Sequence, residues 1–384
     1  MSEILTVEEL KYLTNFRKKL HQFPELSDNE QQTAQAVVEE LKRCNPTTII
    51  TKLGGYGVAA VFNGDLKGKT ILFRAELDAL PIVEENSFEH RSKQEGISHK
   101  CGHDGHATIL IGLARVFKKK PLLKGKVILL FQPSEENGKG AKAVLEDEKF
   151  KSIQPDFVFS LHNVPDFKKG TIVVKNNSFT PSVTSLKIAL KGKTSHAAEP
   201  ENGVNPDIAL QEILIAIKSL ANNNLESETF AVITTIYATL GSKDYGISAD
   251  YAELHFTIRC WTVTQLNHLK EKITAIIKIS SEKHQLKHAL DWIYEFDSTN
   301  NDSKAVDYIR KAAINNSFKI IEKKRPFKWG EDFGAFTQKS NGAMFGLGSG
   351  KNTPALHNPD YDFPDEITPY GVQMFYEILK LIYA

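Results

Sequence analysis

A short segment at residues 98–106 reads Ser-His-Lys-Cys-Gly-His-Asp-Gly-His, and so combines imidazoles, a thiol and a carboxylate. Cys101 and His103 are two residues apart, so a thiolate and a neutral imidazole can face one divalent cation. Such ligands suit zinc or a neighbouring first-row metal. A Cys-x-His pair alone is weak evidence, and a histidine-rich loop without a metal is the alternative. Because a metal needs three or four ligands, the rest of the chain must supply others.

Acidic side chains follow two of the apolar segments. The β-rich run at residues 70–74 leads to Asp78, and the apolar run at residues 126–131 is followed by Glu135 and Glu136. Of two adjacent glutamates, one can bind metal while the other moves protons. Asp78 can orient a ligand imidazole. A helix cap at Asp78 and a solvated position for the two glutamates are the alternatives.

A third apolar run, residues 157–161, ends directly before His162. A helical apolar pattern over residues 107–119 follows the Cys-x-His segment, which places Asp104 near a helix N-terminus. Strand, candidate ligand and helix therefore alternate along this part of the chain. This order predicts an α/β sheet with its site at the strand ends.

The length of 384 residues favours two domains. After Pro181 the pattern changes to strand, helix, strand, strand, helix, strand, which is the order of a split βαβ sandwich. We therefore expect residues 182–297 to form an inserted second domain. Residues 1–181 and 298–384 would together form the other domain.

Composition places the chain among ordinary globular proteins, with 25% charged and 41% apolar residues. A formal net charge of +1 gives no electrostatic support for binding nucleic acid or an anionic membrane. No apolar run approaches the roughly 20 residues of a membrane span, and the start of the chain lacks a signal-peptide pattern. The cysteines Cys44, Cys101 and Cys260 give no disulfide framework, so we expect a cytoplasmic protein.

Eight motifs in order resemble the M20 metallopeptidase family, in particular its amidohydrolase branch of hippurate, N-acyl-amino-acid and indole-acetyl-amino-acid hydrolases. They are LHQFPELS (20–27), FRAELDALPI (73–82), HKCGHDGHATILIGLA (99–114), FQPSEENGKGAKAVLED (131–147), SLHNVP (160–165), GKTSHAAEPENGVNP (192–206), WGEDF (329–333) and ALHNPDYDF (355–363). Any one is modest evidence, but together they are specific. The resemblance implies an α/β fold: a phosphorylase/hydrolase-like catalytic domain with an inserted ferredoxin-like α+β domain for closure or dimerisation.

The resemblance also implies a site with two divalent metal ions, which would be zinc, manganese, cobalt or nickel. The implied ligands are Cys101, His103, Glu136, His162 and His357. Glu135 would be the general base and acid, and Asp78 would support the ligands. His196, on the inserted domain, would donate to the developing oxyanion, either within its own chain or from a dimer partner. His106 matches the motif, but a structural or substrate-contact role is expected for it.

Two positions depart from the family pattern. Gly246 stands where relatives carry an asparagine expected to contact the substrate, and Glu76 replaces the commoner aspartate. We predict a metal-dependent amidohydrolase acting on N-acyl amino acids or related small conjugates, in a homodimer or higher homo-oligomer. A dipeptidase or aminopeptidase of the same fold, a non-catalytic metal-dependent binding protein and an enzyme using Cys101 as nucleophile are the alternatives.

Overall fold

The computed structural model describes residues 4–384, and its internal contacts divide the chain into two compact units. The first unit comprises Met1–Phe179, Thr299–Lys324 and Glu331–Ala384, and the second comprises Thr180–Ser298 and Arg325–Gly330. The sequence prediction had assigned residues 325–330 to the first unit. They belong with the second because they pack on its strands: Arg259 donates to the Lys328 carbonyl oxygen at 2.9 Å. A single hydrogen bond of this kind cannot be read from hydrophobic periodicity.

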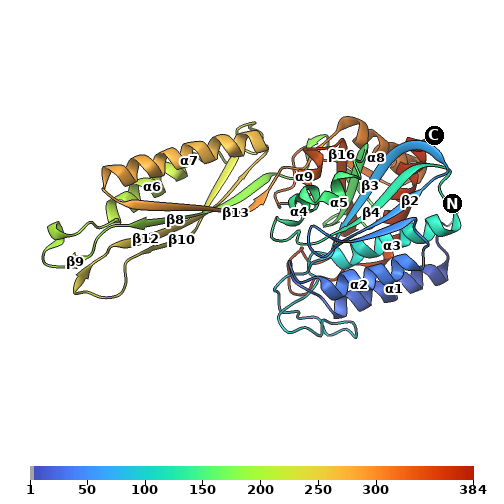
Figure 1. The fold of residues 1–384 in the computed structure, drawn as a ribbon, viewed down its shortest axis with the longest axis horizontal. Helices are drawn as coiled ribbons and strands as arrows, with labels where there is room; N and C mark the ends of the chain where they lie inside the picture. The colour runs from blue at the N-terminus through green and yellow to red at the C-terminus, as the bar shows by residue number, and fades with distance from the viewer. Residues whose placement is uncertain (1–3) are drawn as a thin grey trace. The chain divides into compact units, whose positions relative to one another are not determined.

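The first unit is built on an eight-stranded mixed sheet (Figure 1). Its strands, in spatial order, are β1 (Thr48–Leu53), β2 (Gly57–Asn63), β4 (Lys124–Gln132), β3 (Leu66–Glu76), β5 (Phe157–Pro165), β16 (Gly342–Gly350), β6 (Ile172–Val174) and β15 (Ile320–Glu322). The central strands β4, β3, β5 and β16 run parallel. Their apolar runs are buried on both faces, as expected for parallel strands. Their carboxyl ends therefore meet at one edge of the sheet.

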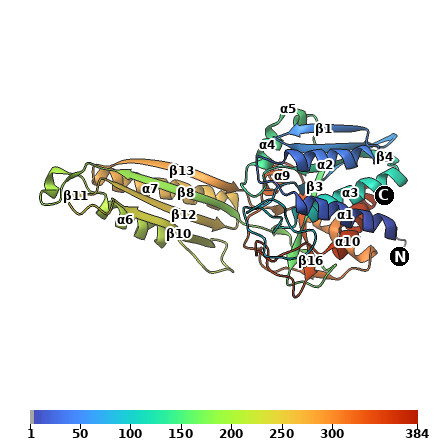
Figure 2. The same ribbon diagram turned by 90° about the horizontal axis from the view of Figure 1, so that it is seen from below.

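Helices cover this sheet and complete its apolar core. They are α1 (Val7–Gln22), α2 (Gln31–Lys42), α3 (His103–Lys119), α4 (Gly140–Glu146), α5 (Glu148–Lys151), α8 (Ser303–Asn315), α9 (Gly334–Thr337) and α10 (Thr368–Tyr383), with a 3-10 turn at Asp365–Ile367. Helix α3 packs against α1, α2, α10 and strand β3, and α1 and α3 lie side by side in Figures 1 and 2. The two-residue strands β7 (Asn177–Ser178) and β14 (Asn300–Asn301), like β6, are too short to show a hydrophobic period, and the sequence did not predict them.

The second unit has the predicted split βαβ order. Its antiparallel sheet runs β10 (Ala231–Leu240), β12 (Tyr251–Cys260), β8 (Ser182–Lys191) and β13 (Lys287–Phe296). Helices α6 (Asp207–Ser219) and α7 (Val263–Lys283) pack on the sheet around its own core. A separate ribbon pairs β9 (Ser195–His196) with β11 (Ile247–Ser248), and a 3-10 turn spans Pro200–Asn202.

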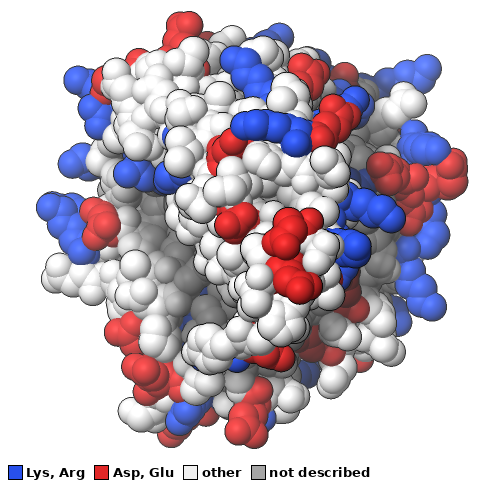
Figure 3. Space-filling view, turned by 90° about the vertical axis from the view of Figure 1, so that its left-hand side faces the viewer, with Lys and Arg blue, Asp and Glu red and all other residues white. Residues whose placement is uncertain are grey.

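Surface charges of both signs are mixed over the face drawn in Figure 3, in keeping with the net charge of +1. Within residues 4–384, none of the helices is both long enough and apolar enough to cross a bilayer.

Candidate metal centre

The strand ends of the first unit bring together every residue predicted as a metal ligand. Their ligand atoms fall into overlapping groups, within each of which all atoms lie within 4.8 Å of one another. Three of these groups hold the predicted residues: Cys101–His103–His162, Cys101–Glu136–His357 and His103–Glu135–Glu136. Side chains more than 250 positions apart in the sequence, Cys101 and His357 among them, therefore share one site.

These side chains come from strand β5, from the start of helix α3 and from the turns and loops beside them. Gly102 has φ +95°, and a Cβ built on it would lie 2.5 Å from the Asn163 side-chain oxygen, so only glycine fits between Cys101 and α3. His357 also has a positive φ of +67°, and its N–H donates to the Lys100 carbonyl oxygen at 2.8 Å. That hydrogen bond ties the C-terminal loop to the residue directly before Cys101.

Unpartnered atoms at the centre make the site suited to cations. Among the described residues, His103 Nε2 and Glu136 Oε1 are buried without a hydrogen-bond partner, and they lie 3.9 Å apart. Glu136 Oε1 is also 3.6 Å from His357 Nε2, and Cys101 Sγ is 3.5 Å from His162 Nε2. Buried polar atoms are normally paired. Nitrogen, sulfur and oxygen atoms that converge in this way fit a pair of divalent cations.

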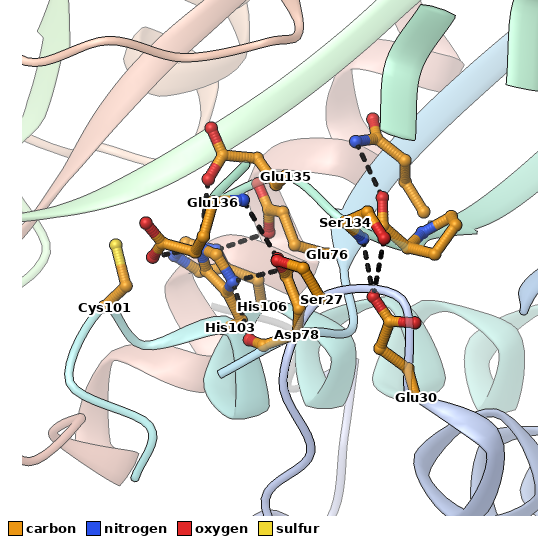
Figure 4. A network of polar contacts seen from close by, with 12 residues as sticks. Ser27, Glu30, Glu76, Asp78, Cys101, His103, His106, Ser134, Glu135 and Glu136 are labelled. Atoms are coloured by element: carbon orange, nitrogen blue, oxygen red, sulfur yellow. Dashed lines mark hydrogen bonds and ion pairs between the residues drawn. The ribbon is translucent and has the colours of Figure 1, made fainter. Parts of the chain in front are cut away.

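The second ring nitrogens of the histidines face away from the centre. His103 faces Asp78 in Figure 4. Its Nδ1 lies 2.9 Å from the Asp78 carbonyl oxygen and 3.3 Å from Asp78 Oδ1. His162 Nδ1 likewise lies 2.8 Å from the Asn163 carbonyl oxygen. Such contacts set the tautomer and leave Nε2 for a ligand bond. Asp78 therefore lies where it can support a ligand imidazole.

The electrostatics of the protein groups alone point the same way. Burial, together with the Glu331 and Glu136 carboxylates, raises the pKa of Glu135 well above its usual range. Burial and the Asp78 charge outweigh the opposing effect of His103 and raise the pKa of Glu136 to about 7. Burial and Glu136 raise the pKa of the Cys101 thiol. The centre thus carries excess negative potential. A divalent cation bound there would relieve this potential and would favour the thiolate form of Cys101.

His106 is not free to act as a ligand in this arrangement. Its Nδ1 lies 2.7 Å from Glu76 Oε2 and its Nε2 lies 2.5 Å from Asn163 Oδ1, so both ring nitrogens are in use. His99 is buried, and neither of its ring nitrogens has a hydrogen-bond partner among the described residues.

His196 lies in the second unit, on the exposed ribbon β9–β11. It pairs with Ile247, and its Nδ1 accepts a hydrogen bond from the Ala198 N–H at 3.0 Å. The carbonyl oxygen of Gly246 accepts from the Ala197 N–H at 3.1 Å. The position that departs from the family pattern is therefore next to His196 within this unit.

Comparison with known proteins decides the family. A sequence model of peptidase family M20/M25/M40 matches residues 72–381. The chain belongs to this family. It is 32% identical over 375 residues to an N-acetyl-L-cysteine deacetylase of Bacillus subtilis, covering 96% of this chain and 88% of that one. It is 31% identical over 333 residues to an N-acetyldiaminopimelate deacetylase of Priestia megaterium, covering 86% and 88%.

A solved structure agrees with these relatives. The crystal structure of the YXEP protein of Bacillus subtilis, described as a dinuclear metal-binding peptidase of the M20 family, superimposes with a TM-score of 0.83. That chain is 27% identical, and 98% of each chain is covered. The predicted fold class and family are confirmed, and so is the class of activity, hydrolysis of amide bonds by a metal-binding enzyme.

One buried group of this hydrolase was missed by sequence reasoning. Arg74, fully buried in β3, donates to Glu331 at 2.9 Å and to Asp332 at 2.6 Å, and also pairs with Glu76. The Asp332 N–H in turn donates to Glu135 Oε1 at 3.3 Å. An arginine directly after the apolar residues Ile71, Leu72 and Phe73 was the available signal, because a buried charge needs a partner.

Proposed function

We propose that the protein is a metal-dependent amidohydrolase that removes the acyl group from a small N-acyl amino acid, with Glu135 as general base and acid. The observation that carries this role is the position of Glu135. Its carboxylate is buried, one oxygen lies 4.0 Å from His103 Nε2, and the other faces the Asp332 N–H. A glutamate at the centre that is not needed as a ligand is free to move a proton.

The proposed metal ligands are Cys101, His103, Glu136, His162 and His357. Zinc, manganese, cobalt and nickel all accept this mixture of nitrogen, sulfur and oxygen atoms. These residues would hold a divalent cation, which would supply a water molecule of lowered pKa and a polarised substrate carbonyl.

Each remaining residue has a separate task in the proposed mechanism. Glu135 takes the proton of the attacking water and later delivers it to the leaving amine. Asp78 keeps His103 oriented through Nδ1. His196 donates a hydrogen bond to the oxyanion of the tetrahedral intermediate, in its own chain or in a partner copy.

The substrate class rests on the relatives and on one departure. The named relatives remove acetyl groups from amino acids, which favours an N-acetyl substrate here. Gly246 offers no side chain at the position where an asparagine is expected, so the amino-acid part must be recognised by other groups. We therefore propose that its preferred N-acyl amino acid differs from that of family members with the asparagine.

Assembly and location complete the proposal. Strand β10 is an edge of the second unit's sheet, and its Ile236 and Tyr237 are exposed. An unpaired edge with apolar side chains favours pairing with another copy, which supports a homodimer or higher homo-oligomer. The three cysteines are buried and unpaired, which suits the reducing cytoplasm.

The test compares substrates and one matched pair of variants. Metal-replete protein should hydrolyse N-acetyl amino acids faster than N-benzoyl amino acids or dipeptides. Glu135→Gln should lower kcat by about 10²–10⁴-fold with bound metal unchanged, whereas Glu148→Gln, an exposed glutamate in α5, should behave as wild type. Metal-replete wild-type protein that hydrolyses none of these amides would overturn the proposal. Turnover that survives complete metal removal would assign the chemistry to Cys101 instead.

A further inference from the structure

The turn that carries Glu135 and Glu136 begins with an unfavourable backbone. Ser134 has φ +55°, in the left-handed region that residues with a Cβ seldom adopt. Glu135 and Glu136 lie in the turn directly after Ser134, so the conformation of Ser134 sets the direction in which this turn leaves strand β4. Some contact must hold Ser134 in this conformation.

Glu30 provides that contact. Its Oε1 accepts hydrogen bonds from the Ser134 N–H at 2.7 Å and from the Ser134 hydroxyl at 3.0 Å. The same oxygen accepts from the Asp28 N–H at 3.1 Å, and that N–H also lies 2.9 Å from Ser134 Oγ. Glu30 is 0% exposed. Glu30 is thus a fully buried carboxylate, and its Oε1 accepts hydrogen bonds from the residue that begins the turn.

The burial of Glu30 is costly, which separates it from an ordinary packing residue. Its second oxygen, Oε2, is buried and has no partner among the described residues. Burial and the nearby Asp78 charge raise the pKa of Glu30 to about 7. A carboxylate placed in this way stabilises the fold less than an apolar side chain of similar size would. The presence of a carboxylate at this position is explained if the conformation of the turn matters.

The segment around Glu30 also contacts the other side of the centre. Ser27 donates to Asp78 Oδ2 at 2.7 Å, and that oxygen accepts from the Glu136 N–H at 2.9 Å. The turn is therefore held at Ser134 by Glu30 and at Glu136 by Asp78, as Figure 4 shows. Between these two anchors only the Glu135 side chain remains to be directed.

We propose that Glu30 is a positioning residue for the reaction: by holding Ser134 in the left-handed conformation, it directs Glu135 toward the metal ligands. The inference rests on the proposed role of Glu135. Among the described residues, Glu30 has no hydrogen bond to a proposed ligand or to Glu135, so its hydrogen bonds to Ser134 are the route by which it acts on the rate.

The experiment removes the contact and then restores the backbone by a second route. Glu30→Gln keeps an oxygen that accepts from Ser134, so kcat should stay within about threefold of wild type. Glu30→Ala should lower kcat at least about tenfold while KM and bound metal change little. In the Glu30→Ala background, Ser134→Gly should recover part of the lost kcat, because glycine adopts positive φ without strain. Ser134→Ala, which also lacks the hydroxyl, should recover none.

The outcomes separate positioning from mere structural support. If Glu30 only supported the fold, Glu30→Ala would lower the melting temperature. In that background, kcat would then be the same with glycine or alanine at position 134. Unchanged kcat in Glu30→Ala, equal loss in Glu30→Gln and Glu30→Ala, or equal kcat for the two double variants would overturn the inference. If Glu30→Ala does not fold, the comparison moves to the wild-type background, where Ser134→Ala must lose more kcat than Ser134→Gly. Inactive wild-type protein would instead overturn the proposed function.

Discussion

At the strand ends of the first unit, Asp78 and His103 are buried and each has hydrogen-bonded or ionic neighbours. On the ribbon β9–β11 of the second unit, His196 is exposed, pairs with Ile247 and accepts a hydrogen bond from the Ala198 N–H. Both regions carry residues to which we assign catalytic roles. One set of side chains is oriented by folding, whereas the other stands on a solvated surface.

This difference determines what a substitution does in each region. Charges buried in the first unit are stabilised only by their partners, so removing one partner affects folding as well as chemistry. An exposed side chain contributes little to folding, so its loss affects chemistry alone. The predictions below test this distinction, from the largest expected effect on stability to the smallest.

Arg74→Met should have the largest effect. The guanidinium is fully buried against Glu331, Asp332 and Glu76. Its removal leaves carboxylates without compensation, which should lower the free energy of unfolding by about 3–5 kcal/mol. Urea denaturation of the metal-free protein measures the change. The matched control is Arg325→Met in the second unit, where a half-exposed arginine pairs with Glu226. Arg325→Met should lower the free energy of unfolding by less than about 1 kcal/mol. Equal effects of the two variants would contradict the distinction between buried and exposed charges.

His21 should make stability depend on pH. Its ring nitrogens lie 2.9 Å from Asp104 and 3.1 Å from Glu84. Burial lowers the pKa of this imidazole, but the hydrogen bonds to the two carboxylates prevail and raise the pKa to about 9. Because the pKa is raised in the folded protein, the stabilisation is fully present below pH ~6.5 and is lost as pH rises toward 9. The shift corresponds to on the order of 3 kcal/mol.

The measurement compares wild type with His21→Gln, whose amide can donate but does not titrate. Free energies of unfolding from urea curves between pH 6 and 9.5 should converge as pH rises. A difference between the two proteins that stays constant over this range would show that His21 does not become charged on folding. The exposed His268 on α7 offers the control, since His268→Gln removes no buried contact and should change the free energy of unfolding little.

The strand ends could be predicted because their residues follow apolar runs that are visible in the sequence. Glu135, Glu136 and His162 each come at or just after the end of such a run, and parallel strands must share an edge. The partners of Arg74 could not be predicted in this way, because Glu331 is 257 positions away. The contact of Glu30 with Ser134 spans 104 positions and depends on a backbone angle. Hydrophobic periodicity carries information about elements and faces, not about side-chain pairs between distant turns.

His196→Ala should have no effect on stability and a large one on rate. The exposed imidazole accepts one hydrogen bond from the Ala198 N–H, which solvent can replace, so the melting temperature should not change. If His196 donates to the oxyanion, its loss should lower kcat by about 10²–10³-fold with a smaller effect on KM. His268→Ala, an exposed histidine of the same unit, should change neither quantity. A drop in melting temperature that accounts for the lost activity would make His196 a structural residue. Full activity would show that residues of the first unit alone stabilise the oxyanion. The contrast between a buried centre and an exposed donor would then have no catalytic meaning.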